Sequence, residues 1–304
     1  MKLSICMPTY NRKDKAVRQM NNIISQILLV NGNEEIEFLV SDNHSSDETL
    51  EYVKQQIENL PSFTVIYRQD TNLGLVGNVD FLFNSAHGEY IWFISDDDIV
   101  TEGSVRKVYD IICTQPKDFY LLNFKTELDG VISDLYWKAS DNYTDLYVDG
   151  KTGGFGLISI EVFRKHPFEK LFCWGDNKGV SLMYPLSRTF YGLFHLNGMM
   201  VFDHAFVIHH VGDYSWSSLN MEVQSVYSLR ALLMLKDLVP DSEFKFMLKL
   251  VTKTYIFRIN SFLYVAKKWR ARYVVELWRN NLLRLVLLAG LLAALKKGKK
   301  CLLR

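Results

Sequence analysis

The sequence has few cysteines and no long apolar run at its start. Its four cysteines lie far apart, and no two of them are separated by only two residues. That spacing excludes a disulfide framework and a zinc-finger pattern, and it is typical of a protein of the reducing cytosol. The residues after Met1 turn polar within the first ten positions and cannot form the apolar core of a signal peptide. We therefore expect a cytoplasmic location.

Glycine and proline are also scarce. At 17 and 6 of 304 residues, they are too rare for a collagen-like or low-complexity fibre. The apolar share of 48% and the charged share of 23% are ordinary for a globular protein and exclude disorder of the whole chain. The length is that of one large domain or two small ones.

Several signatures of nucleotide-binding and hydrolytic enzymes are missing. No Gly-x-Gly-x-x-Gly follows the first strand-like run, which disfavours a dinucleotide-binding fold. The segment Gly150-Lys151-Thr152 resembles the end of a phosphate-binding loop, but Asp145 stands where that loop requires glycine. Neither His-Glu-x-x-His nor Gly-x-Ser-x-Gly occurs, so the common zinc-protease and α/β-hydrolase motifs are absent.

Strand-like apolar runs alternate with helical spacing over the first third of the chain. Strands are predicted at 3–7, 36–40, 63–67 and 90–94, and helices at 12–29, 47–57, 76–86 and from Thr101. Short links between such elements require right-handed crossovers, which predicts an α/β fold with a mostly parallel sheet. Beyond Pro116, strand-like runs at 119–124 and 199–208 flank a glycine-rich turn at 153–156, and helices are predicted at 219–239, 242–267 and 270–295.

Three polar clusters follow predicted strands at their carboxyl ends. They are Thr9-Tyr10-Asn11-Arg12, Ser41-Asp42-Asn43 and Ser95-Asp96-Asp97-Asp98. Parallel α/β sheets bind their ligands at this edge. The placement therefore predicts a ligand site that all three clusters share.

The aspartates from Asp96 to Asp98 stand in a row after an apolar run. Adjacent carboxylates repel one another, and each stays ionised more easily beside a cation. Mg²⁺ or Mn²⁺ takes one or two protein carboxylates and completes its shell with waters and phosphate oxygens. The row thus indicates a metal–diphosphate site, and the alternative is a solvated acidic turn that caps the next helix.

Four segments in this order resemble glycosyltransferase family 2. They are MPTYNR, VSDNHSSDET, NLGLVGN and GEYIWFISDDD, and together they cover about residues 1–115. Within the family, SDN and SDDD are similar to the abequosyltransferase-type enzymes of O-antigen synthesis. The resemblance implies a GT-A fold (Rossmann-like, with a mostly parallel sheet flanked by helices) and inverting transfer from a nucleotide sugar, with Mg²⁺ or Mn²⁺ as cofactor. It also implies an acceptor in bacterial O-antigen, capsule or related polysaccharide synthesis.

The resemblance also implies roles for individual residues. The nucleotide pocket would be formed by Pro8, Thr9, Tyr10, Arg12, Asp42, Asn72, Gly74, Asn78 and Asp96. Asp42 would accept hydrogen bonds from the base, and Gly74 would allow close backbone approach. Asp97 would be the direct metal ligand, with Asp96 beside it, although Ser95 replaces the leading aspartate of the family motif. Asp98 would either bind a water of the metal's coordination shell or cap the next helix.

An inverting transfer needs a base for the acceptor hydroxyl, and a carboxylate provides one. The resemblance points to Asp176, which follows Trp174-Gly175; the alternative is that Asp176 caps a helix. Glu161 is the second candidate, with a surface position as its alternative. His209 is a candidate metal ligand or a structural residue. The aromatic rings of Trp174, Tyr214 and Trp216 are predicted either to stack on sugars or to pack internally.

The charge of the chain is divided unevenly along its length. Residues 244–304 hold 15 Lys and Arg against one acid, Glu276, whereas the rest holds 20 basic and 33 acidic residues. The apolar run at 285–295 is too short to span a bilayer, which takes about 20 residues. The preceding basic, amphipathic stretch at 269–284 favours a helix in the headgroup plane.

The predicted organisation follows from these patterns. A nucleotide-sugar-binding half covers 1–115, an acceptor-binding half covers 116–218, and a helical, basic extension covers 219–304. The extension would hold the enzyme at the inner membrane surface beside a lipid-linked saccharide acceptor. Its alternative is packing on the catalytic domain or on another subunit of a homo-oligomer. No nucleic-acid recognition motif occurs.

Two other classes of protein stay open. A nucleotidyltransferase would need a glycine-rich, basic triphosphate loop after the first strand, where MPTYNR offers only Arg12. A catalytically inactive membrane adaptor would keep the sugar-nucleotide fold without turnover.

Overall fold

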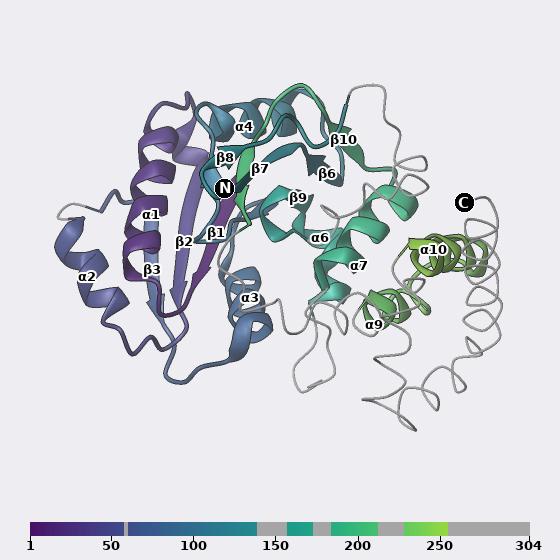
Figure 1. Ribbon diagram of the computed structural model, residues 1–304, viewed down its shortest axis with the longest axis horizontal. Coiled ribbons are helices and arrows are strands. Elements are labelled where there is room, and N and C mark those ends of the chain that lie inside the picture. The colour runs from purple at the N-terminus through teal and green to yellow at the C-terminus, as the bar shows by residue number, and fades with distance from the viewer. Residues whose placement is uncertain (58–59, 139–156, 173–183, 212–227, 255–304) are drawn as a thin grey trace, which may run out of the picture. The chain divides into compact units, whose positions relative to one another are not determined.

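The computed structural model describes residues 1–57, 60–138, 157–172, 184–211 and 228–254. The chain forms two compact units, drawn together in Figure 1. Unit 1 comprises Met1–Asp141, Leu157–Lys178 and Gly192–Asp213, and unit 2 comprises Asn142–Gly156, Gly179–Tyr191 and Tyr214–Arg304.

Unit 1 carries all of the described strands and four of the longer helices. Its strands are β1 Leu3–Thr9, β2 Ile36–Asp42, β3 Thr64–Arg68, β4 Tyr90–Phe93, β5 Ile99–Val100, β6 Phe119–Leu122, β7 Phe124–Leu128, β8 Val131–Ile132, β9 Glu161–Arg164, β10 Met199–Val201 and β11 Val207–His210. Its helices are α1 Lys13–Leu28, α2 Thr49–Gln56, α3 Gly74–Ser85, α4 Ser104–Thr114 and the short α6 Lys165–Phe168.

The main sheet has the strand order β10-β6-β9-β4-β1-β2-β3. The four strands predicted in the first third are confirmed, and they lie parallel to one another. Strand β9 runs antiparallel between β4 and β6, so the sheet is mixed, but its other strands all run in one direction and the predicted mostly parallel sheet is confirmed. Strand β9 was not predicted, because its two apolar residues lie between the charged Glu161 and Arg164.

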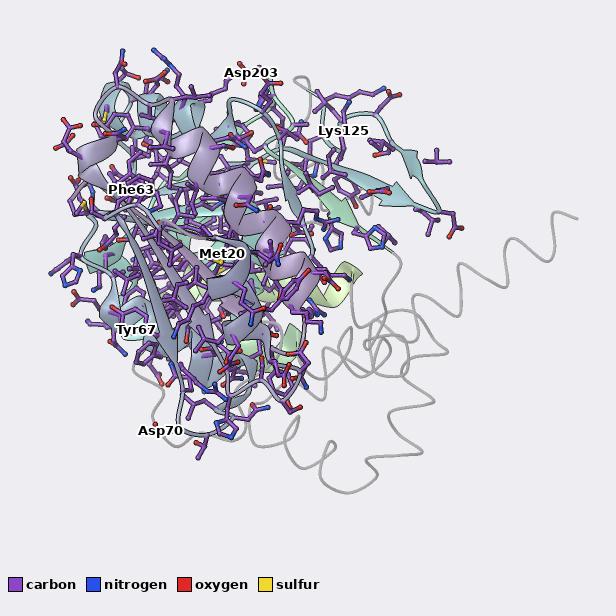
Figure 2. The ribbon with its side chains drawn as sticks, turned by 90° about the vertical axis from the view of Figure 1, so that its left-hand side faces the viewer. Met20, Phe63, Tyr67, Asp70, Lys125 and Asp203 are labelled. Atoms are coloured by element: carbon purple, nitrogen blue, oxygen red, sulfur yellow. The ribbon has the colours of Figure 1, made fainter. Side chains whose placement is uncertain are left out.

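Helices cover both faces of this sheet. The connections β1-α1-β2 and β2-α2-β3 step in one direction along the sheet, whereas α3 returns from β3 to β4 in the other. With right-handed crossovers, α1 and α2 share one face and α3 covers the opposite one (Figure 1). The core face of α1 includes Met20, Ile23 and Ile27, all fully buried, and Met20 lies within the packed body in Figure 2.

A second sheet, β5-β11-β7-β8, was not predicted. The run at 119–124 breaks at Asn123 into β6 and β7, and the run at 199–208 breaks into β10 and β11, which join different sheets. Asn123 is fully buried, and its amide donates to the carbonyls of Trp137 at 2.8 Å and Phe202 at 3.0 Å. One buried polar side chain thus fixes the corner at which both segments change sheets.

The β7–β8 hairpin turns at Asp129 and Gly130, whose φ angles are 50° and 79°. Two consecutive positive φ values are those of a type I′ hairpin turn, and they explain the Asp-Gly pair. In Figure 2 the hairpin, marked by Lys125, projects from the body of unit 1.

In unit 2, the described helices are α7 Tyr184–Phe190, α9 Ser228–Leu233 and α10 Asp241–Thr254. Helix α9 packs against both α7 and α10. Among the described residues, no helix is long and apolar enough to cross a membrane. The predicted turn at 153–156, the predicted helix at 270–295 and most of the basic extension lie outside the described residues.

Candidate active site

The three predicted polar clusters meet at the carboxyl edge of the main sheet. Strands β1 and β2 are in register, with Thr9 opposite Asp42. Strand β4 pairs with β1 on the other side, and the Ile94 N–H donates to the Cys6 carbonyl at 2.9 Å. Residues 95–98 therefore emerge beside Thr9, as the sequence predicted.

The loops after β1 and β2 are held together by hydrogen bonds around Asn11. Its backbone N–H donates to Ser45 Oγ at 2.8 Å, and its Oδ1 accepts the Ser46 N–H at 2.8 Å. The Asn43 N–H donates to the Thr9 carbonyl at 3.0 Å. Asn11 has a φ of 52°, a conformation that asparagine tolerates better than most residues. The two loops consequently form one rigid rim.

Asp42 lies at the base of this rim and is 1% exposed. Its carboxylate accepts the Ser45 N–H at 3.3 Å and the Ser45 hydroxyl. These bonds orient the carboxylate within its own turn. Ser45 was not among the predicted site residues, although an aspartate side chain commonly bonds to the backbone that follows it in a turn.

Asn43 fixes the loop that precedes α3. Its amide donates to Asn72 Oδ1 at 3.0 Å and to the Gly74 carbonyl at 3.2 Å, and its Oδ1 accepts the Leu73 N–H at 2.9 Å. Gly74 has a φ of 70°, which explains glycine there. The sequence placed Asn43 in a polar cluster after a strand, but its role in holding Asn72 and Gly74 was not predicted.

Other predicted pocket residues are placed differently. Asn78 is 2% exposed, and its amide bonds to Ser41 through both its oxygen and its nitrogen. Pro8 is buried within β1, whereas Tyr10 is 43% exposed on the rim.

Arg12 joins the first two aspartates of the row. Its Nη1 lies 2.7 Å from Asp96 Oδ1 and 2.7 Å from Asp97 Oδ2. The other Asp96 oxygen accepts the Thr9 hydroxyl at 2.7 Å, and the other Asp97 oxygen accepts the Ser95 hydroxyl. The carboxylates are thus fixed by β1, by the start of α1 and by their own turn.

The two carboxylates differ in their ionisation. Burial raises the pKa of Asp96, and the guanidinium of Arg12 and the hydroxyl of Thr9 oppose that rise without cancelling it. Burial alone would raise the pKa of Asp97 too, but the hydrogen bond from Ser95 and the charge of Arg12 outweigh it and lower that pKa. The Asp97 side chain is also the more accessible, at 23% exposed against 4% for Asp96. Asp97 is therefore the better placed to meet a ligand as an anion.

Asp98 turns away from the pair towards β11. Its Oδ1 accepts the Nδ1–H of His209 at 2.7 Å, and α4 begins only at Ser104. Burial would lower the pKa of His209, but the hydrogen bond to Asp98 and the charges of Asp98 and Asp97 outweigh it and raise that pKa. Asp98 therefore orients His209, a role that sequence pattern did not reveal because the two residues are far apart in the chain.

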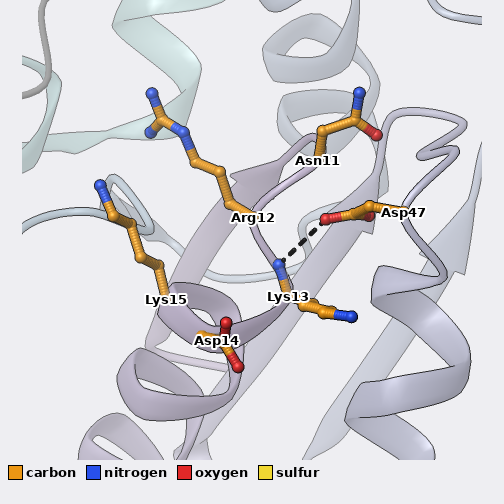
Figure 3. Close-up of a pocket in the computed structure, with 6 residues that line it drawn as sticks. All are labelled: Asn11, Arg12, Lys13, Asp14, Lys15 and Asp47. Atoms are coloured by element: carbon orange, nitrogen blue, oxygen red, sulfur yellow. Dashed lines mark hydrogen bonds between the residues drawn. The ribbon is translucent and has the colours of Figure 1, made fainter.

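A pocket of about 440 Å³ opens at the start of α1. It is lined by Asn11, Arg12, Lys13, Asp14, Lys15 and Asp47. Figure 3 shows Arg12 and Lys15 extending to one side of the helix start, and Lys13 to the other. Lys13 reaches the ring of Tyr52, with its Nζ 5.5 Å from the ring centroid. Of this lining, Arg12 was predicted as a nucleotide-pocket residue and Asn11 as part of the polar cluster after the first strand.

The candidates for the base and for sugar stacking are not all placed. Asp176, Trp174, Tyr214 and Trp216 lie outside the described residues. Glu161, for which a surface position was the expected alternative, is instead fully buried in β9. Its position opposite Leu121 at the centre of the sheet accounts for that burial.

The described residues include no cluster of three or more Asp, Glu, His and Cys side chains that could hold a metal ion unaided. The aspartate row contributes the accessible carboxylate of Asp97, although all of its carboxylates, Asp97 included, contact protein donors. The row therefore suits an ion that brings ligands of its own more than it suits a permanently bound one.

Comparison with known proteins places this arrangement among glycosyltransferases. A model of the family Glycosyl transferase family 2 matches residues 4–172. Abequosyltransferase RfbV of Salmonella typhimurium is 34% identical over 126 residues, which are 41% of this chain and 36% of that protein. The GalNAc(5)-diNAcBac-PP-undecaprenol beta-1,3-glucosyltransferase of Campylobacter jejuni is 29% identical over 107 residues, 34% of this chain and 32% of that protein. The match thus spans about a third of each relative.

A solved structure shares the fold. Mannosyltransferase PcManGT from Pyrobaculum calidifontis, in complex with GDP-Man and Mn²⁺, superposes with a TM-score of 0.61 at 13% sequence identity. The superposition covers 97% of this chain and 86% of that one.

Proposed function

Because the chain belongs to glycosyl transferase family 2, we propose that it transfers a sugar from a nucleotide-diphosphate sugar to a saccharide acceptor. Its mixed sheet flanked by helices is a GT-A-like fold. The observation that carries the proposal is the Asp96–Asp97 pair, which lies at the carboxyl edge of the sheet beside a pocket whose lining includes three basic and two acidic side chains.

The donor would lie along this edge with its base near Asp42 and the loop at 72–74, and its diphosphate near Arg12 and Asp97. Three features support this orientation: Asn43 fixes the loop, Arg12 and Lys15 supply positive charge, and the amide groups at the start of α1 favour an anion. The polar atoms of Asp42 and Asn78 already form hydrogen bonds within the protein. We therefore expect these two residues to shape the nucleotide pocket as much as to contact the nucleotide.

A divalent metal fits the site as a partner of the donor. Asp97 supplies an anionic carboxylate, and the Nδ1 of His209 bonds to Asp98, the second-sphere pairing that is usual for a ligating histidine. We assign Asp97 as the protein's direct ligand, with Asp96 beside it and His209 as a further ligand. When bound, Mg²⁺ or Mn²⁺ acts as a Lewis acid that stabilises charge on the leaving diphosphate.

The reaction would be a single inverting displacement. The acceptor hydroxyl forms a bond to the anomeric carbon as the bond from that carbon to the diphosphate breaks, and the hydroxyl proton passes to a carboxylate on the opposite face. Asp176 is the proposed base, and such a base contributes a factor of about 10² to 10⁴. Arg12 and Lys15 would balance the negative charge on the departing nucleoside diphosphate.

The acceptor is proposed to be a lipid-linked saccharide of bacterial surface-polysaccharide synthesis. The names of the two relatives support this class, since one transfers abequose and the other acts on an undecaprenol-linked oligosaccharide. The basic stretch at 244–304 supports attachment to an anionic membrane surface, where about 1 kcal/mol is gained for each basic residue.

A donor screen tests the proposal. The full chain is incubated with UDP-, GDP-, CDP- and dTDP-sugars, Mn²⁺ and an acceptor extract, and nucleoside diphosphate release is measured. The proposal predicts release for one donor class only when Mn²⁺ is present. Consumption of a nucleoside triphosphate with pyrophosphate release would instead support a nucleotidyltransferase. Binding without any turnover would support the adaptor.

A further inference from the structure

The carboxylate oxygens of Asp96 and Asp97 already accept hydrogen bonds from side chains of the protein. The Arg12 Nη1 lies 2.7 Å from one oxygen of each carboxylate. The Thr9 hydroxyl occupies the second oxygen of Asp96, and the Ser95 hydroxyl occupies that of Asp97. All four carboxylate oxygens therefore accept a hydrogen bond from the chain itself.

Of these donors, Arg12 is the one that can leave. The Thr9 and Ser95 side chains are short, and each is fixed by the backbone at the site. The Arg12 side chain is long, 32% exposed, and placed on the wall of the 440 Å³ pocket. A guanidinium binds a phosphate as well as it binds a carboxylate, through paired hydrogen bonds. A diphosphate in the pocket would thus offer Arg12 an alternative partner.

A cation cannot share this position with Arg12. The guanidinium lies within hydrogen-bond distance of both carboxylates, so an incoming ion would meet a positive charge at contact distance and one oxygen fewer on each aspartate. Repulsion at that range exceeds thermal energy several-fold, even at the screening typical of a protein surface. Ser95 provides no carboxylate on one side of the pair, and Asp98 on the other side is bound to His209, so neither neighbour offsets this repulsion.

We infer that Arg12 is a positioning residue: its guanidinium stays bound to Asp96 and Asp97 until the diphosphate of the sugar donor draws it away. This inference rests on the proposed function. Divalent metal therefore binds together with the donor and not before it. Arg12 acts in two places in turn, first as the internal counter-ion of the aspartates and then as a contact to the diphosphate.

Calorimetric titration with MnCl₂ alone tests this inference on the full chain, without turnover. The variants are Arg12→Gln and Arg12→Met, with Lys13→Gln as the matched control. Lys13 is the adjacent lysine of the same pocket, but its side chain points to Tyr52 on the other side of the helix start. We expect wild type to bind Mn²⁺ weakly and both Arg12 variants to bind at least about tenfold more tightly. Lys13→Gln should stay within about twofold of wild type, because the Lys13 ammonium lies over the Tyr52 ring and forms no ion pair with Asp96 or Asp97.

A second titration repeats the series with saturating nucleoside diphosphate. Wild type should then bind Mn²⁺ at least about tenfold more tightly than without nucleotide, and its difference from the Arg12 variants should narrow or reverse. Merely structural damage from losing Arg12 would weaken Mn²⁺ binding in both titrations. Circular dichroism establishes that each variant is folded.

Unchanged or weaker Mn²⁺ binding by folded Arg12 variants would overturn the inference. So would a wild type that binds Mn²⁺ equally well with and without nucleotide, a result that needs no variant. Failure of the proposed function looks different, because wild type would then bind none of the nucleoside diphosphates, whatever the Arg12 variants do with Mn²⁺ alone.

Discussion

The two edges of the main sheet each contain a buried carboxylate system, and the two systems are built differently. At the amino edge, Glu37 is 6% exposed and accepts the Ser4 hydroxyl at 2.5 Å and the His87 N–H at 2.6 Å. The Ser4 hydroxyl in turn accepts the Gly88 N–H at 2.7 Å. At the carboxyl edge, Asp96 and Asp97 depend on the long side chain of Arg12.

The difference separates a structural carboxylate from a functional one. The shortest hydrogen bonds to Glu37 come from the His87 backbone N–H and the short Ser4 hydroxyl, which have no alternative position and stay in place, and the exposed His87 ring lies 3.1 Å from the other carboxylate oxygen. Arg12, the donor that Asp96 and Asp97 share, is 32% exposed and borders a pocket. Its contact with the two carboxylates can therefore be exchanged for another. Burial alone, which the two edges share, does not identify a site.

The largest effect is expected from Asp97→Asn, which tests whether the carboxyl-edge pair is functional. The substitution removes the accessible anion but keeps the side chain's shape, so nucleoside diphosphate release should fall at least about a hundredfold. The melting temperature should change little, because Asp97 is the more exposed of the pair. The control is Asp110→Asn on the exposed surface of α4, which should retain full activity. Substantial nucleoside diphosphate release by Asp97→Asn would show that Asp97 is not a functional carboxylate.

The converse experiment is Glu37→Ala. It leaves the Ser4 hydroxyl and the His87 N–H without their buried acceptor, so the free energy of unfolding should fall by about 2–3 kcal/mol. Denaturant unfolding measures the loss, and Glu37→Gln, which keeps one acceptor oxygen, should lose less. Affinity for the nucleoside diphosphate should be unchanged in the folded fraction. A variant that kept its stability but lost donor binding would contradict the assignment.

A smaller effect is expected from Asn43→Ala on the loop that precedes α3. The variant loses three hydrogen bonds to residues 72–74, which should cost about 1–2 kcal/mol of stability. Because this loop is proposed to border the base, affinity for the nucleoside diphosphate should fall about tenfold, while the metal dependence of binding stays intact. An effect on stability alone would confine Asn43 to the fold.

The smallest effect is a pH dependence at His204, in the connection between β10 and β11. Burial, followed by the charge of Lys107, lowers the pKa of His204 from its ordinary value of 6.5. The unfolded chain therefore binds the proton first as the pH falls, so folding stability is lost as the pH drops below that value. His204 Nε2 lies 2.9 Å from Ser104 Oγ, and His204→Gln should flatten this part of the stability profile. The exposed His166→Gln serves as the control, and equal profiles for the two variants would refute the assignment.

The first third of the fold was predictable because local signals agree there. Alternating apolar runs placed β1 to β4, and the polar residues after each strand placed the site edge. The second sheet was not predictable, since its strands are short and its corner depends on contacts between Asn123 and residues distant in the chain. The same reason hid the pairing of Asp98 with His209 and the bridge from Arg12 to both aspartates, because no local pattern encodes contacts between remote loops.

The most direct test of the central claim is calorimetric binding of nucleoside diphosphates, with and without Mn²⁺, to wild type and Asp97→Asn. The account predicts that wild type binds one nucleoside diphosphate much more tightly with Mn²⁺, and that Asp97→Asn loses this enhancement. An enhancement of equal size in Asp97→Asn, or no nucleotide binding by wild type under either condition, would contradict it.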